Sequence, residues 1–218
     1  MDRTKIHKTF LLIFVAVLAV LLMIFLKIIP SFGLEITENN KASNYLQMDK
    51  DIYYNQTRND CAPYSVMCVI NVLKGIKIDP EILIQQTRWR NARNLTFPQG
   101  LLELLHKNNI ETKDYNLCFY STDKKITWLK NQIDNGSPVI LLVKVGYGQH
   151  YFTVIGYDET GFMLYDSSQE KLDEDSIMTK IDREEYVGNR YYTNEELIGL
   201  WDKGGYILPF KNWAIVCN

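Results

Sequence analysis

The chain has 218 residues, an apolar content of 46% and a formal net charge of −2. This length suits one ordinary domain with an appendage, and the composition is that of a globular protein rather than a disordered one. No long basic stretch is present, so the sequence argues against a nucleic-acid-binding protein.

The first predicted element is an apolar segment near the N-terminus. Residues 10–26 contain no charged or polar side chain, which is close to the lower limit for a membrane-spanning helix. Three basic residues precede the segment and one, Lys27, follows closely; positive flanks stay in the cytoplasm. We therefore expect a cytoplasmic tail at 1–8 and a single-pass membrane anchor at 9–29, with the rest of the chain outside. The alternative is a signal peptide cleaved near 31–33, which would give a secreted protein.

Residues 30–50 are mixed and polar and are predicted to form a linker, followed by a globular domain over 51–218. Asp60 and Gly75 have the residue types that begin and end a helix, and apolar residues at helical spacing lie between them. Periodicity and Pro at helix starts predict further helices. The four predicted helices cover residues 61–74, 80–90, 98–107 and 124–135.

Strands are predicted in the second half of the domain. The predicted strands are Pro138–Val145, His150–Tyr157, Phe162–Asp166 and Trp213–Cys217, and the motif DETG reads as a hairpin turn. Thr193 and Glu196 have the spacing of a capping box for a short helix through Trp201. Helices precede the sheet, so we expect an α+β fold with an N-terminal helical half and a C-terminal antiparallel sheet.

Cys61 is the strongest candidate for a nucleophile. It lies at the start of a predicted helix, and the partial positive charge of a helix N-terminus favours the reactive thiolate. Cys68 lies in the middle of the same helix and lacks that advantage. Taken alone, a cysteine at this position is more often structural, so the interpretation depends on its partners.

His150 is the predicted base, because it opens an apolar strand after the flexible run GYGQ. Asp166 ends the strand that follows the DETG turn. Antiparallel pairing with the His150 strand can bring its carboxylate to the imidazole and fix the tautomer of the imidazole. His106, late in a Leu-rich helix, and Asp158, in the hairpin turn, are weaker alternatives. Acyl transfer also needs oxyanion donors, for which the backbone N–H of Cys61 and the side-chain amide of Gln56 are candidates.

The remaining cysteines, Cys68, Cys118 and Cys217, show no paired zinc-binding spacing. If Cys61 stays free, at most one intramolecular disulfide can form among these three. Burial as small apolar residues is an equally good interpretation.

These residues carry a resemblance to a known family. The strings NQTRNDCAPYS, PQG and GQHYFTVIGYD…YDSS, with TNEELIGLW further on, resemble the papain-clan cysteine peptidases of family thirty-nine, the bacteriocin-processing type that cleaves double-glycine leaders. The resemblance covers residues 52–217 and includes the order Gln, Cys, His, Asp. Two departures from the family pattern are Ala62, where Gly is usual, and Asn55, which stands where the family has its Gln.

The resemblance implies a papain-like fold in which Cys61 is the nucleophile, His150 the base, Asp166 its orienter and Gln56 the oxyanion donor. It implies no metal and no organic cofactor. We expect a membrane-anchored, extracytoplasmic thiol hydrolase that cleaves a peptide or amide bond in a peptide or protein substrate. Two alternatives stay open: a binding module of the same fold with weak or no catalysis, and an acyltransferase or transpeptidase that uses the same cysteine.

Overall fold

The computed structural model describes residues 13–20, 22, 31, 36, 41–168, 187–206 and 208–218. The chain divides into two units, Met1–Pro30 and Ser31–Asn218. In the first unit, residues 13–20 and 22 are helical, and the other residues of the predicted anchor at 9–29 lie outside the described part. No helix within the described ranges is both long enough and apolar enough to cross a membrane.

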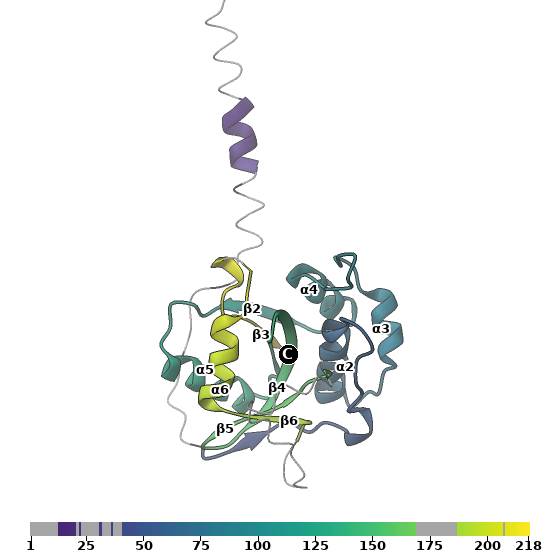
Figure 1. Cartoon of the computed structure of the whole chain (residues 1–218), viewed down its shortest axis with the longest axis vertical. Coiled ribbons are helices and arrows are strands. Elements are labelled where there is room, and N and C mark those ends of the chain that lie inside the picture. Colours follow the sequence, from purple (N-terminus) through teal and green to yellow (C-terminus); the bar gives the residue numbers. More distant parts are fainter. Residues whose placement is uncertain are drawn as a thin grey trace, which may run out of the picture. The chain divides into compact units, whose positions relative to one another are not determined.

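The second unit is built on one antiparallel sheet (Figure 1). Its strands are β1 (Asn44–Tyr45), β2 (Thr112–Asn116), β3 (Val139–Val145), β4 (Gly148–Tyr157), β5 (Gly161–Tyr165), β6 (Arg190–Thr193) and β7 (Trp213–Cys217). The strand order is β2-β7-β3-β4-β5-β6, and β1 pairs with the end of β4. The segment predicted as a linker thus contributes a strand to this sheet through residues 44–45.

Helices cover both faces of the sheet. The helices are α2 (Cys61–Lys74), α3 (Pro80–Gln86), α4 (Pro98–Lys107), α5 (Thr122–Asp134) and α6 (Asn194–Lys203), with 3-10 turns η1 (Lys50–Ile52) and η2 (Leu208–Phe210). Side chains of α2, α3 and α4 share one buried core with one face of the sheet. Side chains of α5 and α6 share a second core with the other face, and Figure 1 shows the two helix groups on opposite sides of the strands.

The α+β class and the antiparallel sheet agree with the sequence prediction, but the expected division into a helical half and a sheet half is only partly right. Strand β3 reads VILLVKV, and its first five residues are buried. Alternate side chains of a strand point to opposite faces, so a continuous apolar run must be covered on both. Helices α5 and α6 provide the second cover, and β7, the last predicted strand of the chain, lies between β2 and β3.

Helices α2 and α4 have the predicted bounds, and the capping box of α6 forms as predicted. The predicted helix over 80–90 is wrong at its end, because α3 stops at Gln86. The chain turns there, and Trp89 has a positive φ of 54°, which no α-helix contains. Strands β1, β2 and β6 were not predicted.

Strands β4 and β5 form the predicted hairpin around DETG. The carboxylate of Asp158 accepts hydrogen bonds from the backbone N–H groups of Thr160 and Gly161, both at 2.8 Å. The ladder shifts register between Val154 and Gly156, so Ile155 is an extra residue, a β-bulge. Beyond the bulge the hairpin pairs regularly up to Thr153 and Tyr165.

Candidate active site

The nucleophile candidate lies at the start of α2. Cys61 is the first residue of the helix and its side chain is buried. Asp60 occupies the N-cap position as predicted, but its carboxylate makes no capping hydrogen bond. It instead pairs with the guanidinium of Arg90, which leaves the N–H groups of the first turn, including that of Cys61, without this cap.

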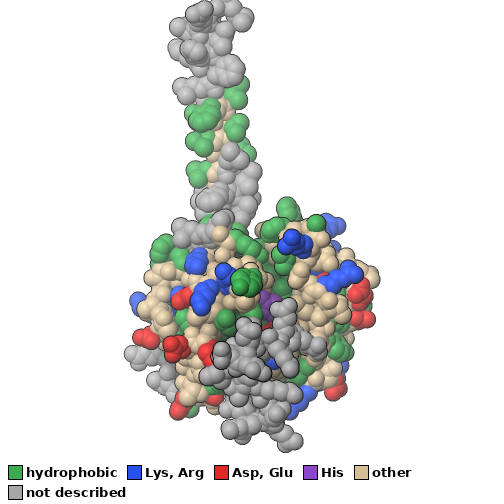
Figure 2. Space-filling view, in the orientation of Figure 1, with side chains coloured by type: hydrophobic (Ala, Val, Ile, Leu, Met, Phe, Trp, Pro, Cys, Tyr) green, Lys and Arg blue, Asp and Glu red, His purple; other side chains and the backbone are tan. Residues whose placement is uncertain are grey.

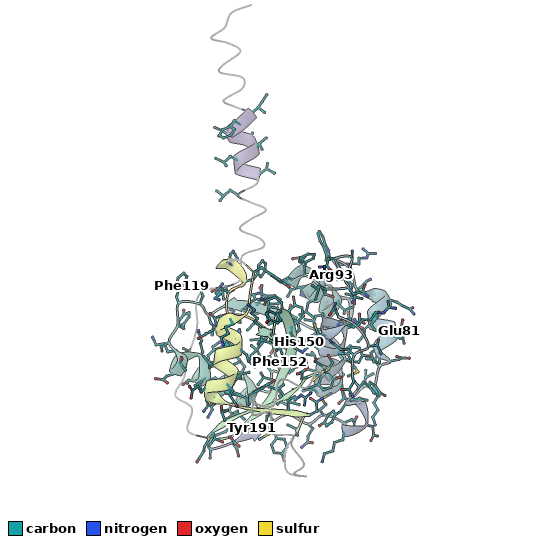
Figure 3. All side chains as sticks on the ribbon, viewed as in Figure 1. Glu81, Arg93, Phe119, His150, Phe152 and Tyr191 are labelled. Atoms are coloured by element: carbon teal, nitrogen blue, oxygen red, sulfur yellow. The ribbon has the colours of Figure 1, made fainter. Side chains whose placement is uncertain are left out.

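Strand register brings the candidate base to its carboxylate. His150 lies near the start of β4, and Asp166 directly follows β5. Thr153 pairs with Tyr165, so Asp166 and His150 are diagonal neighbours on one face of the hairpin. His150 Nε2 lies 2.7 Å from Asp166 Oδ1, with both side chains buried. His150 and Phe152 lie on the same face of β4, with their ring centroids 6.3 Å apart (Figure 3).

Asp166 is itself held firmly by the chain that follows it and by the start of β6. Its Oδ1 accepts a hydrogen bond from the backbone N–H of Ser168 at 2.8 Å. The side chain of Asn189 bonds both backbone groups of Asp166, at 2.8 and 2.7 Å. Arg190 Nε lies 3.8 Å from Asp166 Oδ2, and its Nη2 donates to the carbonyl of Ser168 at 2.8 Å. The carboxylate therefore has a fixed position and a second nearby cation.

The electrostatics of this pair favour a charged imidazole. Burial alone lowers the pKa of His150, but the charge and hydrogen bond of Asp166, with a smaller contribution from Cys61, outweigh it and raise the pKa to about 10. Burial acts to raise the pKa of Asp166, and His150, Ser168 and Arg190 more than compensate, so that the pKa is lowered. Each partner thus stabilises the charged form of the other.

The Cys61 side chain also acts on the imidazole. After Asp166, Cys61 contributes to raising the pKa of His150, so the thiol and the imidazole lie near each other. Because Nε2 is engaged by Asp166, Nδ1 is the ring nitrogen available to a further partner. In the space-filling view a histidine side chain is visible between the α2–α4 side and the sheet side of the molecule (Figure 2).

Gln56 lies beside the end of β5. Its backbone N–H donates to the carbonyl of Ser167 at 2.8 Å, and its side-chain oxygen accepts from Ser167 Oγ at 2.9 Å. The amide oxygen is thereby held, and the NH₂ group is turned to donate elsewhere. Asn55 is exposed and lines a surface pocket with Tyr64 and Lys77. Of these two neighbouring residues, it is Gln56 that is hydrogen-bonded to Ser167, the residue after Asp166.

The rival residues lie elsewhere. His106 is exposed, and its Nε2 lies 2.8 Å from Thr112 Oγ1. All four cysteines are free thiols, so the structure contains none of the disulfides that the sequence left open. Cys68 and Cys217 are fully buried, and burial raises the pKa of both thiols, whereas Cys118 is half-buried. Among the described residues no group of three or more His, Cys, Asp or Glu side chains is arranged to hold a metal ion.

Several residues that complete the site were not found by sequence reasoning. Ser167 directly follows Asp166 and was not singled out, Asn189 directly precedes β6, and Arg190 is the first residue of β6, a strand that was not predicted. Burial, and then the charge of Cys61, raise the pKa of Tyr206, a half-exposed tyrosine that the sequence did not single out. Each acts through a contact between distant parts of the chain, and no local pattern signals such contacts.

Comparison with known proteins finds one family model and several solved structures that are similar to this chain. The model of the Peptidase_C39 like family matches residues 41–196. A structure described as a C39-like peptidase from Bacillus anthracis has a TM-score of 0.51 at 13% identity, covering 82% of this chain and 98% of that one. The peptidase domain of Streptococcus ComA has a TM-score of 0.46 at 16% identity, covering 81% and 98%. A double-glycine motif protease of an AMS/PCAT transporter, solved with its leader peptide, has a TM-score of 0.46 at 14% identity, covering 85% and 98%. No curated protein matches the chain in sequence.

An α+β unit with a cysteine at a helix start and a buried histidine–carboxylate pair contains the residue types that thiol-based acyl transfer needs. The chain belongs to the Peptidase_C39 like family, whose model covers well over half of its length. The predicted family resemblance is therefore confirmed, and family membership supports peptide cleavage by a cysteine peptidase in general terms.

Proposed function

We propose that the protein is a thiol hydrolase that cleaves a peptide bond through an acyl-enzyme on Cys61. The observation that supports this most strongly is the buried pair of His150 and Asp166, joined at 2.7 Å, whose histidine pKa is also raised by Cys61. A nucleophile, a base and an orienting carboxylate in this order are the parts that nucleophilic acyl transfer needs.

The proposed reaction begins with the thiol proton on the imidazole. Cys61 Sγ attacks the scissile carbonyl carbon, and the carbonyl oxygen takes the negative charge. As the C–N bond breaks, the imidazolium of His150 gives its proton to the leaving amine. Water then attacks the thioester while His150 accepts one of its protons, and the S–C bond breaks to give a carboxylate and the free thiol.

The oxyanion is proposed to accept hydrogen bonds from the backbone N–H of Cys61 and the side-chain NH₂ of Gln56. Support comes from the absence of a capping bond at Asp60 and from the hold of Ser167 on the Gln56 oxygen. Such donors are aimed before the charge develops and need no reorganisation, which makes them effective.

The test compares Cys61→Ala with Cys118→Ala on a library of internally quenched peptides. We expect Cys61→Ala to lose at least about a thousandfold in turnover, and Cys118→Ala, a change at a half-buried thiol, to keep it. Gln56→Ala should lower kcat about a hundredfold, and Asn55→Ala should leave it within about twofold. Cleavage that survives in Cys61→Ala would refute the proposed nucleophile.

A binding module and an amine acyltransferase are the competing functions. A binding module predicts that Cys61→Ala binds peptide as well as the parent protein does, and that neither protein forms a cleavage product. The second predicts products that contain an added amine and form only when an amine acceptor is supplied. Hydrolysis predicts equal product formation with and without such an acceptor, so mass spectrometry of the products separates the three.

We further propose that the N-terminal segment anchors the peptidase in a membrane with the catalytic unit outside. Support comes from the uninterrupted apolar run at 10–26 and from the helical residues 13–20 and 22, whose large apolar side chains are each more than half exposed. Replacing Val17 and Leu18 together by Lys should release the chain from membranes washed with alkaline carbonate. Release of the parent chain in the same wash would contradict the anchor.

A further inference from the structure

We propose that residues 88–97, here called the bridge loop, set the position of the nucleophile relative to the base, and that Arg90 is the positioning residue within this loop. The inference rests on the proposed function, since it assigns a role toward Cys61 and His150. The loop connects α3 to α4 and contacts the chain immediately before Cys61 and immediately after His150.

The first attachment is to the residues that precede the nucleophile. Arg90 Nη2 donates to the carboxylate of Asp60 and, at 3.3 Å, to the carbonyl of Asn59. Asn59 Nδ2 in turn donates to the carbonyl of Arg93 at 2.8 Å. Two residues in a row before Cys61 are therefore bonded to the bridge loop.

The second attachment is to the strand that carries the base. Tyr151 follows His150 on β4, and its hydroxyl donates to the carbonyl of Thr96 at 3.1 Å in a buried position. The tyrosine ring is buried in the core beneath α2, α3 and α4. One short loop therefore joins the start of α2 to the start of β4.

Hydrogen bonds within the bridge loop hold its two attachments in a fixed relation to each other. Arg90 Nε and Nη2 both donate to the carbonyl of Asn94, at 3.0 and 2.7 Å. Arg90 and Thr96 form an isolated antiparallel bridge, and Phe97 N–H donates to the carbonyl of Trp89 at 3.0 Å. The base of the loop lies so close to α4 that a Cβ on Gly100 would come 2.4 Å from the carbonyl of Arg88.

Charge gives Arg90 a second effect on the nucleophile. Asp60 directly precedes Cys61, and the residue is only 3% exposed. Unpaired, this buried negative charge would oppose the thiolate and the oxyanion beside it. The guanidinium of Arg90, with its side chain 13% exposed, balances it. Arg90 therefore both fixes the chain before Cys61 and neutralises the carboxylate that directly precedes it in the sequence.

The experiment measures the alkylation rate of Cys61 by iodoacetamide at pH 7, read by peptide mass spectrometry, together with kcat and KM. Arg90→Gln is expected to slow alkylation about tenfold and to lower kcat with KM unchanged. Asp60→Asn is expected to accelerate alkylation, because it leaves the guanidinium unbalanced beside the thiol. Arg90→Gln with Asp60→Asn is expected to return to within about threefold of the parent rate.

Arg93→Gln is the matched control, because it removes the same charge from the same loop while the contact to Asn59 uses the backbone carbonyl. Its alkylation rate should stay within about twofold of the parent. Tyr151→Phe removes the second attachment and should lower kcat without slowing alkylation. If Arg90→Gln does not fold, Asp60→Asn and Arg90→Lys carry the test, and Arg90→Lys should alkylate at the parent rate because it keeps the charge.

Two results would overturn the inference: alkylation of folded Arg90→Gln at the parent rate, or alkylation of Asp60→Asn slower than the parent. A purely structural role would slow both variants and would not reverse the sign between them. Failure of the proposed function is seen separately, because in that case Cys61→Ala retains peptide cleavage while the alkylation series still reports on the loop.

Discussion

At the scale of single residues, the protonation state of His150 decides what the site can do. A buried histidine without a partner would be neutral, since burial disfavours the charged form. The carboxylate of Asp166 reverses this and raises the pKa of His150 to about 10. An imidazolium is then available at neutral pH to pair with a thiolate and to protonate a leaving amine.

This protonation state predicts the alkaline limb of the pH–rate profile. kcat/KM of the parent protein should fall as His150 loses its proton, with a midpoint near pH 10. Asp166→Asn removes the largest contribution that raises this pKa, so its alkaline limb should move down toward about 6.5, the ordinary value for histidine. The measurement is kcat/KM against pH for both proteins, and identical alkaline limbs would contradict the assignment.

The same shift has a consequence for folding. A histidine whose pKa is raised in the folded state stabilises the fold at pH values below its unfolded pKa, and this contribution is lost as pH rises through the folded value. The free energy of unfolding should therefore decline between about pH 6.5 and pH 10. His150→Gln should flatten this part of the stability curve.

At the scale of elements, α2 is both a core helix and the helix that carries the proposed nucleophile. Eleven of its residues, from Cys61 to Asn71, are buried. Its end is fixed by Gly75, which has a φ of 64° and whose N–H donates to the carbonyl of Asn71 at 2.8 Å. The left-handed conformation suits glycine and is strained for other residues.

Two glycine substitutions distinguish the effect of backbone conformation from the effect of steric clash. A Cβ on Gly75 or on Gly199 would have no heavy atom within 4 Å, so neither alanine would clash. Gly75→Ala should lower the free energy of unfolding by about 1 kcal/mol because of its positive φ, and Gly199→Ala, inside α6, should raise it by about 0.5–1 kcal/mol. Urea denaturation of both variants measures this, and the same sign for both would be contrary to expectation.

Elements with local signals could be predicted from the sequence. The caps and periodicity of α2, α4 and α6 lie within a few residues of each helix, and these helices were found. Strands β2 and β6 read TKDYN and RYYT, and such polar edge strands are defined by their pairing partner rather than by their own pattern. After the early end of α3 the chain turns, with a positive φ at Trp89, and Arg90 contacts Asp60 far away in the sequence, which no pattern over 80–90 contains.

The site divides in the same way. Residue type, order and position at element starts were enough to nominate Cys61, His150 and Asp166, and strand register then brought the last two to 2.7 Å. The residues that hold the site come from distant parts of the chain. The side chain of Asn189 is hydrogen-bonded to the backbone of Asp166, and the hydroxyl of Ser167 to the side chain of Gln56. Their catalytic roles stay predictions until the variants are measured.

At the scale of the whole second unit, one sheet serves two cores. Leu141 and Leu142 are adjacent on β3, are fully buried, and belong to opposite cores. Because the sheet is shared, we expect damage to either core to be felt by the whole unit rather than by one side of it.

Leu141→Ala and Leu142→Ala test this coupling. Each should cost about 2–5 kcal/mol of the free energy of unfolding through lost burial and an added cavity. Both should still unfold in one transition that is the same by tryptophan fluorescence and by far-ultraviolet circular dichroism. Two separate transitions in either variant would show that the cores are independent.

The bulge at Ile155 has a consequence for how the length of this chain can vary. On the His150 side of the bulge, Thr153 and Val154 pair with Tyr165 and Leu164 in one register; on the turn side, Gly156 and Tyr157 pair with Met163 and Phe162 in another. A one-residue deletion between His150 and Val154 would turn the imidazole to the opposite face, whereas removal of Ile155 or a change in the DETG turn would leave the pair aligned. We expect insertions and deletions in related chains to gather on the turn side of this bulge.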